Sequence, residues 1–348
     1  MAKAPALLIR ADGNAAIGTG HLMRCLALAQ AWRHHGGGAA LLAAAVPEAV
    51  RTRFIREGIP VAAMPAEPGD PEDAKLTIGA ARRAGAAWIV ADGYRFGSAY
   101  QLAIRRSRFR LLVIDDGRHA EHYYAHVVLN QNPHAEESLY AAREPDTRLL
   151  LGPQYALLRR EFLQWNEWTR EFPARTPRVL VTMGGGDPDN VTARVLEALE
   201  ALPGRLETVA VAGPANPHAA ELERFSKGAK AAVRLERQPA KMPELMSWAD
   251  LAVSAAGSTV WELAFMGLPA ALIVLAENQA PIAERLEAAG VALNLGLADT
   301  LTGEAVAGAA GALLGDAARR RGMSARGRAL VSGEGASHVA AELANGSR

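Results

Sequence analysis

Short apolar runs alternate with longer, alanine-rich amphipathic segments along this 348-residue chain. Short runs bounded by glycine or polar residues are typical of buried strands, and the segments between them have helical spacing. Strands that alternate with helices pack as parallel sheets, so the pattern predicts an α/β fold. In the first half, the runs expected to be strands are Leu7–Ile9, Ala40–Ala45, Trp88–Ala91, Leu111–Ile114 and Val127–Leu129.

The pattern restarts after a polar and aromatic stretch, Arg159–Pro177, which contains Pro173 and Pro177 and reads as a linker. A chain of this length is large enough for two α/β domains. We therefore expect domains at residues 1–170 and 171–320, followed by a helical tail at 321–348. The strands expected in the second half are Arg178–Met183, Thr208–Val211, Val233–Leu235, Leu251–Val253 and Ala270–Leu275.

Composition excludes several classes of protein. Lys and Arg total 38 against 37 Asp and Glu, so no net field favours nucleic acid or an anionic membrane. The single cysteine, Cys25, makes no internal disulfide, and no run approaches the roughly 20 apolar residues of a membrane span. We expect a soluble, cytoplasmic protein without nucleic-acid partners.

A glycine-rich segment, Gly18-Thr19-Gly20-His21, joins the first predicted strand to the first predicted helix. Met23 stands where a dinucleotide fingerprint requires a small residue, and no Gly-Lys-Ser/Thr follows, so both common phosphate loops are excluded. The segment delivers His21 to a helix start at the ligand-binding edge of a sheet, where a catalytic base belongs. The alternative is that Gly20-His21 merely starts a helix.

Three clusters of glycine, hydroxyl and amide residues follow predicted strands in the second half, and such strand ends meet at one sheet edge. Their coincidence favours a nucleotide pocket. Two alternatives stay open: Asp187 or Asn190 caps a helix, and Thr259 with Glu262 forms a capping box. The expected UDP-binding residues are Gly184, Gly185, Asp187, Asn190, Ser254, Gly257, Ser258, Thr259, Glu262, Asn278 and Gln279.

Nine motifs between about residues 9 and 280 together carry a family resemblance. They are Arg10-Ala11-Asp12, Ile17–Cys25, Asp92-Gly93-Tyr94, Ile114-Asp115-Asp116, Asn130-Gln131-Asn132, Leu151–Arg159, Gly184-Gly185-Gly186-Asp187, Ser254–Glu262 and Asn278-Gln279. With them the chain resembles the UDP-2,4-diacetamido-2,4,6-trideoxy-β-L-altropyranose hydrolases of pseudaminic acid biosynthesis and the related spore-coat polysaccharide proteins.

The resemblance implies a GT-B fold, in which two Rossmann-like domains face a cleft and the terminal helix crosses back to the first domain. It implies that UDP is held by the second domain and that water replaces the acceptor sugar. Water then attacks the anomeric carbon with inversion, and the family's catalytic histidine maps onto His21. A neutral imidazole can take the proton of that water, and backbone N–H groups can stabilise the departing UDP without a metal.

Polar residues at the ends of the other predicted strands of the first half are expected to line the sugar site. Gly18 and Gly20 are expected to leave room for the sugar and water to approach His21. Asp12 either orients the imidazole, binds the sugar or caps a turn. For Asp115 and Asp116 we favour loop capping or substrate hydrogen bonds, and we expect no metal at His119, His122 and His126. The residues expected at the sugar are Asp12, Gly18, Gly20, Arg24, Asp92, Tyr94 and Asn132.

The sequence thus predicts an inverting nucleotide-sugar hydrolase that needs no cofactor. The alternatives are a GT-B glycosyltransferase with a UDP-sugar donor and a nucleotide-sugar-binding protein without turnover. We expect the protein to be a monomer. We expect the acetyltransferase that acts earlier in the pathway to be a separate protein, since the sequence ends at Arg348 without a fused one. The stereochemistry of the sugar does not follow from the sequence.

Overall fold

The structure is a computed structural model that describes residues 5–172, 177–229, 232–237 and 241–346. Pro173 of the predicted linker and the last two residues of the predicted tail lie outside the described residues. The chain forms two compact units. The first contains the residues up to Gly13, His21–Arg160 and those from Glu334 onward, and the second contains Asn14–Gly20 and Glu161–Gly333.

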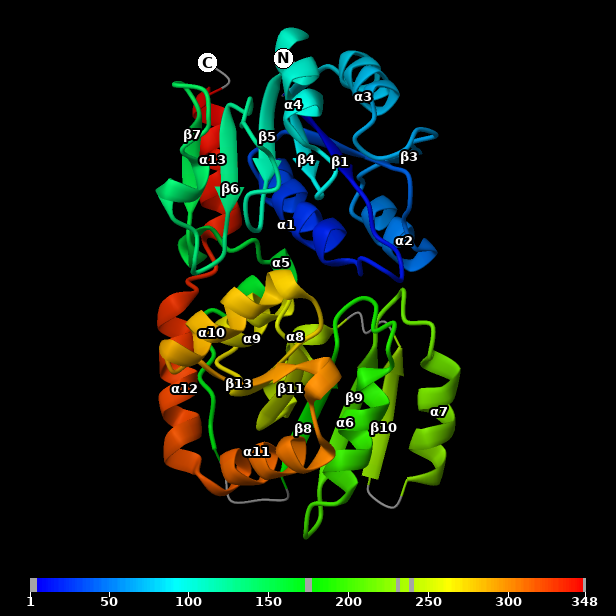
Figure 1. The fold of residues 1–348 in the computed structure, drawn as a ribbon, viewed down its shortest axis with the longest axis vertical. Coiled ribbons are helices and arrows are strands. Elements are labelled where there is room, and N and C mark those ends of the chain that lie inside the picture. Colours follow the sequence, from blue (N-terminus) through cyan, green and yellow to red (C-terminus); the bar gives the residue numbers. More distant parts are fainter. Residues whose placement is uncertain (1–4, 173–176, 230–231, 238–240, 347–348) are drawn as a thin grey trace. The chain divides into compact units, whose positions relative to one another are not determined.

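The first unit is built on a seven-stranded sheet in which all neighbouring strands are parallel. Its strands are β1 (Ala6–Ala11), β2 (Gly38–Ala43), β3 (Val61–Ala63), β4 (Ala86–Asp92), β5 (Arg110–Ile114), β6 (Val127–Asn130) and β7 (Arg148–Leu151). They lie in the order β3-β2-β1-β4-β5-β6-β7 (Figure 1). The chain reverses its direction of travel across the sheet between β1 and β4, the switch point at which open α/β sheets bind ligands.

Helices cover both faces of this sheet. They are α1 (Gly20–His34), α2 (Glu48–Arg56), α3 (Pro71–Ala84), α4 (Ser98–Arg106) and α13 (Gly335–Gly346), with short 3₁₀ turns η1 (Glu137–Tyr140) and η2 (Pro153–Tyr155). α1, α2 and α13 share one apolar core, whereas α3 and α4 pack on the other face. The last helix is tied to the sheet by a 3.0 Å hydrogen bond from Trp88 Nε1 to the carbonyl of Leu343.

The second unit has a six-stranded parallel sheet. Its strands are β8 (Arg178–Thr182), β9 (Glu207–Ala212), β10 (Ala232–Arg237), β11 (Leu251–Ala255), β12 (Ala270–Val274) and β13 (Ala292–Leu297), in the order β10-β9-β8-β11-β12-β13. Its helices are α6 (Val191–Glu200), α7 (Ala219–Gly228), α8 (Met242–Trp248), α9 (Thr259–Phe265), α10 (Ala280–Ala288), α11 (Gly303–Gly315) and α12 (Ala317–Leu330). Short turns η3 (Glu277–Gln279) and η4 (Ala298–Thr300) follow β12 and β13, and α5 (Arg160–Leu163) begins at the division between the units.

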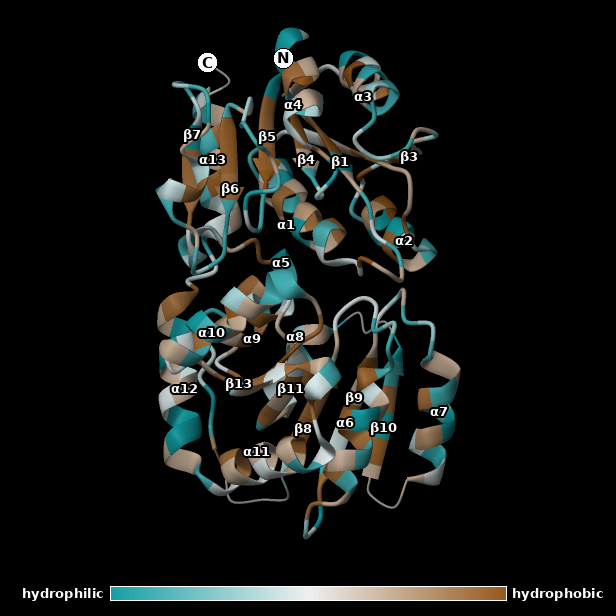
Figure 2. Ribbon diagram, in the orientation of Figure 1, coloured by the Kyte–Doolittle hydropathy of each residue, from teal (hydrophilic) through white to brown (hydrophobic). Residues whose placement is uncertain are grey.

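Every predicted strand is present, and the predicted α/β class is confirmed. Figure 2 shows why: the strands of both sheets are mostly hydrophobic, and polar residues gather on the helices. Three strands were not predicted, namely β3, β7 and β13, and each is an edge strand with partly exposed residues. No helix in the described part of the chain is long and apolar enough to span a membrane.

Candidate functional site

His21 is the second residue of α1, as predicted. The helix follows a tight turn in which the side chain of Asn14 accepts hydrogen bonds from the backbone N–H groups of Ala16 and Ile17. The turn closes at Gly18, whose φ of 71° lies in the left-handed region that favours glycine. The glycine-rich segment therefore sets the start of α1 and with it the position of the imidazole.

The imidazole of His21 is hydrogen-bonded to Asp92, the last residue of β4, with 2.6 Å between Nδ1 and Oδ1. β4 pairs with β1 in a register that places Asp92 beside Ala11. The end of β4 and the start of α1 therefore meet at the switch point of the sheet. Both side chains are buried, and Asp92 is only 1% exposed.

The charge of Asp92 determines which nitrogen of His21 carries a proton. Burial alone would raise the pKa of Asp92, but the adjacent positive charge of Arg24 lowers it below the ordinary value. An ionised carboxylate only accepts hydrogen bonds, so Nδ1 of His21 must be the donor. Nε2 has no hydrogen-bond partner among the described residues. This is the arrangement of a general base oriented by a carboxylate.

One face of α1 surrounds the carboxylate of Asp92. Oδ1 accepts from His21 Nδ1 and from Arg24 Nη2 at 2.7 Å, and Oδ2 accepts from Arg24 Nε at 2.7 Å and from the thiol of Cys25 at 3.4 Å. Positions i, i+3 and i+4 lie on one side of a helix, which explains the spacing of these residues. A carboxylate has about four acceptor positions, so α1 alone fills them all.

Arg24 also pairs with a second carboxylate, Asp116, which follows β5. Arg24 Nη1 donates to Asp116 Oδ1 at 2.6 Å, and Nη2 donates to Oδ2 at 3.0 Å. Asp116 also accepts from the hydroxyl of Tyr94 at 3.2 Å and from Asn132 Nδ2 at 3.0 Å. The structure thus brings together five of the predicted site residues, namely His21, Arg24, Asp92, Tyr94 and Asn132. It turns the guanidinium of Arg24 toward carboxylates rather than outward to a sugar.

Asp12 lies apart from His21. Its Oδ1 accepts from the backbone N–H groups of Ala44 at 2.6 Å and Ala45 at 3.1 Å, and its Oδ2 pairs with Arg10 at 2.7 Å. Arg10 and Asp12 are two positions apart at the end of β1 and therefore point to the same side. The idea that Asp12 orients the imidazole is wrong, because Asp92 occupies that place, and the hydrogen bonds agree with the turn-capping alternative.

Asp115 caps its own loop, one of the two roles favoured from the sequence. It accepts hydrogen bonds from the backbone N–H groups of Gly117 and Arg118 and from the Tyr123 hydroxyl, and it contacts His119 Nδ1 at 3.0 Å. Burial lowers the pKa of His119, but the hydrogen bond that His119 donates to Asp115 and the charge of Asp115 help to raise that pKa above the ordinary value.

The other two histidines of that group lie in different surroundings. His122 is bonded to Glu144 at 2.9 Å, and His126 Nδ1 accepts from the backbone N–H of Leu111. Within the described ranges, no three His, Cys, Asp or Glu side chains are grouped so that they could hold a metal ion.

In the second unit, the three predicted clusters lie at the ends of β8, β11 and β12, which are adjacent parallel strands. Gly184 follows β8 with a φ of 81°, which favours glycine. A Cβ atom at Gly257, after β11, would lie 3.7 Å from Nε2 of Gln279, which belongs to the turn after β12. The sheet therefore brings the clusters to one edge, next to the switch point between β8 and β11.

Three of the expected UDP-binding residues are turned inward. Asp187 accepts hydrogen bonds from the backbone N–H groups of Val191 at 2.7 Å and Thr192 at 3.0 Å, so it caps α6. The hydroxyl of Ser254 is buried in β11 and donates to the carbonyl of Ala255. Oδ1 of Asn190 is buried without a hydrogen-bond partner in the described chain. The capping alternative for Asp187 is thus the one that the geometry supports.

The capping box that the sequence left open as an alternative for Thr259 and Glu262 does not match the observed start of α9. α9 begins at Thr259, its N-cap residue is Ser258, and the Ser258 side chain makes no capping hydrogen bond. The side chain of Ser258 therefore does not cap α9. Ser258 and Thr259 begin this helix at the strand edge. Glu262 lies one turn along the same helix and is partly buried.

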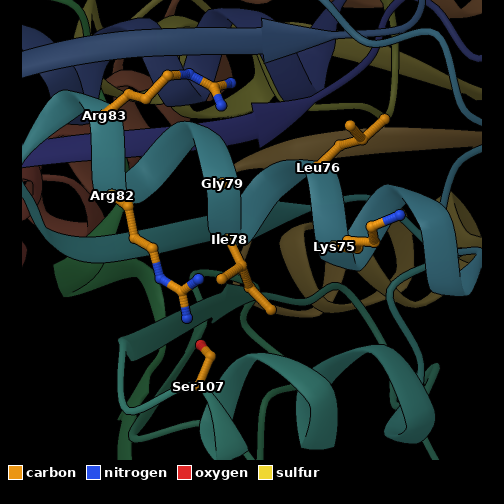
Figure 3. Close-up of a pocket in the computed structure, with 7 residues that line it drawn as sticks. All are labelled: Lys75, Leu76, Ile78, Gly79, Arg82, Arg83 and Ser107. Carbon is orange, nitrogen blue, oxygen red and sulfur yellow. The ribbon is translucent and has the colours of Figure 1, made fainter.

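A pocket of about 500 Å³ lies elsewhere, on the outer side of α3, and none of the predicted site residues lines it. Figure 3 shows Arg82 extending from α3 toward Ser107, which follows α4. Lys75, on the same helix, pairs with Glu72 at 3.1 Å. The pocket is separate from the switch point of the sheet.

Two features of the site were not predicted. The bond between His21 and Asp92 joins residues 71 positions apart, and the sequence alone does not place β4 beside β1. The second is the contact of Cys25 with Asp92, because the sequence indicated only that this cysteine makes no internal disulfide. The spacing of His21, Arg24 and Cys25 on one helix face was the available signal that all three approach one group.

Comparisons with known proteins agree with this architecture. Residues 178–326 match the family described as "Glycosyltransferase family 28 C-terminal domain". An uncharacterized protein of Methanocaldococcus jannaschii is 27% identical over 281 residues, which cover 78% of this chain and 56% of that protein. The spore coat polysaccharide biosynthesis protein SpsG of Bacillus subtilis is 29% identical over 201 residues, covering 57% and 58%. The chain thus matches little more than half the length of these relatives.

Solved structures resemble nearly the whole chain. MurG of Acinetobacter baumannii has a TM-score of 0.67 at 18% identity, covering 98% of this chain and 99% of that one. The spinosyn rhamnosyltransferase SpnG, complexed with thymidine diphosphate, has a TM-score of 0.66 at 16% identity, covering 99% and 100%. HepE of Anabaena, in complex with UDP and glucose, has a TM-score of 0.63 at 14% identity, covering 98% and 100%. The chain therefore has the GT-B fold, and the match to the glycosyltransferase family 28 C-terminal domain lies within its second unit.

Proposed function

We propose that the protein is an inverting nucleotide-sugar hydrolase in which His21 activates water. The observation that carries the proposal is the hydrogen bond from His21 to Asp92, which leaves Nε2 as an acceptor at the switch point of the first sheet. The proposed substrate is a UDP-linked diacetamido-trideoxyhexose, of the kind implied by the family resemblance. Its proposed products are the free sugar and UDP.

In the proposed reaction, Nε2 of His21 accepts a proton from water while the water oxygen bonds to the anomeric carbon. The bond between that carbon and the diphosphate oxygen breaks, and UDP leaves with the electron pair. Asp92 holds the ring and stabilises the imidazolium as it forms. Attack from the face opposite the leaving group inverts the anomeric centre.

For the second unit, we propose that the strand edge holds UDP. Uncapped backbone N–H groups at Ser258 and Thr259 suit a diphosphate, and Glu262 can accept hydrogen bonds from ribose hydroxyls. Solved structures with the same fold have been obtained with UDP and glucose and with thymidine diphosphate, which supports this proposal. Asn278 and Gln279, after β12, are the proposed amide contacts at the same edge.

For the sugar, we propose Tyr94 and Asn132 as contacts in the first unit. Both side chains donate to Asp116, which fixes their positions, and Tyr94 is 46% exposed. Its ring lies edge-on to that of His21, with 5.1 Å between centroids. A sugar bound against Tyr94 would therefore lie near the proposed base.

The test is UDP release from a panel of UDP-diacetamido sugars without any acceptor, followed by proton NMR to identify the first anomer formed. His21→Ala and His21→Asn are expected to abolish release while UDP binding by calorimetry stays within about twofold. His122→Asn is the matched control, because this histidine is bonded to Glu144 near the surface. Undiminished turnover in both His21 variants would refute the role of His21 as base.

A second candidate is a GT-B glycosyltransferase with a UDP-sugar donor. It is favoured by the match of residues 178–326 to a glycosyltransferase domain. The same His21 would then deprotonate a sugar or lipid hydroxyl instead of water. UDP release that requires an acceptor would favour this candidate, and UDP binding without turnover of any tested sugar would indicate a nucleotide-sugar-binding protein.

A further inference from the structure

We propose that Arg24 and Asp116 are positioning residues for His21: Arg24 favours the neutral imidazole with Nε2 as its free acceptor, and Asp116 holds Arg24 in place and limits that effect. This inference rests on the proposed role of His21 as base, and it assigns a task to two side chains that do not approach the lone pair themselves.

Asp92 alone would make His21 a poor base. A buried carboxylate 2.6 Å from Nδ1 favours the imidazolium form, because opposite charges at this distance stabilise each other strongly. An imidazolium has no lone pair at Nε2 and cannot accept a proton from water. A nearby positive charge must therefore counter the effect of Asp92 if the ring is to stay neutral.

Arg24 supplies that offset from the same helix. Its guanidinium makes two hydrogen bonds of 2.7 Å to Asp92, one to each oxygen, and is 6% exposed. Its Nη2 also lies 3.1 Å from Nδ1 of His21. Because Nδ1 already donates to Asp92 and Nη2 cannot accept, this contact sets a cation beside the ring and opposes its protonation.

Asp116 weakens the electrostatic effect of Arg24 on the protonation of His21. It takes two further hydrogen bonds from Arg24, so the guanidinium is shared between two carboxylates. The groups that face His21 are thus Asp92 from β4, Arg24 from α1, Tyr94 from the loop after β4 and, through Arg24, Asp116 from the loop after β5. Removing the cation or the second carboxylate should move the titration of His21 in opposite directions.

The network has one end at the surface. Tyr94 donates to Asp116, Asp116 holds Arg24, and Arg24 holds Asp92. Of these residues Tyr94 alone is exposed, so a molecule that binds to its hydroxyl would change the hydrogen bonding of Asp116. The network therefore connects a proposed sugar contact to the proposed base without any direct bond between the two.

The experiment follows the ring nitrogens of His21 by NMR in the full chain labelled with ¹⁵N-histidine, across a pH series, with the signal assigned by His21→Asn. In the wild type, the neutral form is expected to carry its proton on Nδ1. Arg24→Gln is expected to raise the midpoint of the His21 titration by about one pH unit or more, since it removes an adjacent positive charge. Asp116→Asn is expected to lower it, because Arg24 then pairs with Asp92 alone.

Arg105→Gln is the matched control, because Arg105 pairs with Asp146 away from the site, and it should leave the midpoint unchanged. Unchanged midpoints in both site variants, or shifts in the same direction, would overturn the proposal. If Arg24→Gln fails to fold, Asp116→Asn decides alone: a lower midpoint supports the proposal and an unchanged one refutes it. The NMR measurement needs no turnover, so a wild type that releases no UDP would refute the hydrolase and leave this result standing.

Discussion

The two sheets have the same strand order around their switch points, but their carboxyl edges carry different chemistry. In the first unit, β1 and β4 meet at the switch point, and the residues there are titratable side chains bonded to one another: His21, Asp92 and Arg24. In the second unit, β8 and β11 meet there, and the residues are glycines and small hydroxyl residues. One topology thus presents a cluster of hydrogen-bonded titratable side chains in one unit and a backbone-rich edge in the other.

The difference bears on which edge can hold a diphosphate. The first edge carries the buried carboxylates Asp92, Asp115 and Asp116. Their negative charges would repel a bound diphosphate unless a cation lay beside it. At the second edge the one buried carboxylate, Asp187, is turned toward α6 and bonded to backbone N–H groups. A proton acceptor suits the first edge and an anion suits the second, so substitutions at the two edges should fail in different ways.

The largest effect is expected for Asp92→Asn. The amide oxygen should pair with Arg24, and the amide nitrogen should then donate to Nδ1 of His21. That reverses the tautomer, so Nε2 carries the proton and cannot act as a base. We expect UDP release to fall by about 10²–10⁴-fold, because a base in the wrong tautomer is lost to catalysis. Steady-state kinetics on the substrate found by the panel would measure it.

UDP affinity in this variant should stay within about twofold, since the change lies at the first edge. Asp116 still pairs with Arg24, so no buried cation is left alone. If UDP binding fell as much as turnover did, the separation of tasks between the two edges would be contradicted.

The sequence predicted the central strands of both sheets because buried parallel strands are continuous apolar runs. It missed β3, β7 and β13, three of the four edge strands, each of which has partly exposed residues, and it predicted the fourth, β10. These three strands contribute little to either candidate site, so the candidate residues could be predicted without them.

The candidate site was predicted in part. A local signal, glycines before a helix, was enough to place His21 in the first turn of α1. The partner of His21 depends on which strands are neighbours, and this choice is made by the tertiary fold, so Asp12 was considered where Asp92 is found. Likewise, Asp187 follows glycines as a phosphate ligand would, but its side-chain direction depends on a φ of 87° that composition does not reveal.

The second prediction concerns Glu262 in α9. If it binds ribose hydroxyls, Glu262→Ala should weaken UDP binding by about ten- to a hundredfold, the value of one or two hydrogen bonds to a charged group. The affinity should fall by more than the melting temperature does, because Glu262 is not the N-cap residue of α9. Calorimetry with UDP and thermal melting give the two values. A larger loss of stability than of affinity would favour the capping role.

The third prediction concerns Asp187, for which the opposite ranking is expected. Asp187→Ala removes the cap of α6 and should destabilise the second unit by about 2 kcal/mol, at the upper end of capping effects. Its φ of 87° adds strain for alanine, so Asp187→Asn, which tolerates this backbone conformation, should lose less. Urea unfolding followed by circular dichroism measures both. A tenfold loss of UDP affinity without loss of stability would instead identify Asp187 as a ligand of the nucleotide.

The smallest effect is expected at the charged edge, in the pH dependence of stability from His119 and Asp115. The pKa of His119 is raised in the folded protein, so its stabilisation is complete below its unfolded value of about 6.5 and is lost as the pH rises through the folded value. The pKa of Asp115 is lowered, where burial opposes the shift and the hydrogen bond with His119 outweighs it, so its contribution is lost only as the pH falls below about 4.

The pair therefore stabilises the first unit most between these limits, and His119→Gln should lower the melting temperature by about 2 °C more at pH 6 than at pH 9. His122→Gln is the matched control, because the side chain of His122 is 34% exposed and its pair with Glu144 contributes little at either pH. Equal losses at both pH values for His119→Gln would mean that the imidazole is held there by packing alone. In that case the charges of the first edge would be confined to the network of Asp92, Arg24 and Asp116.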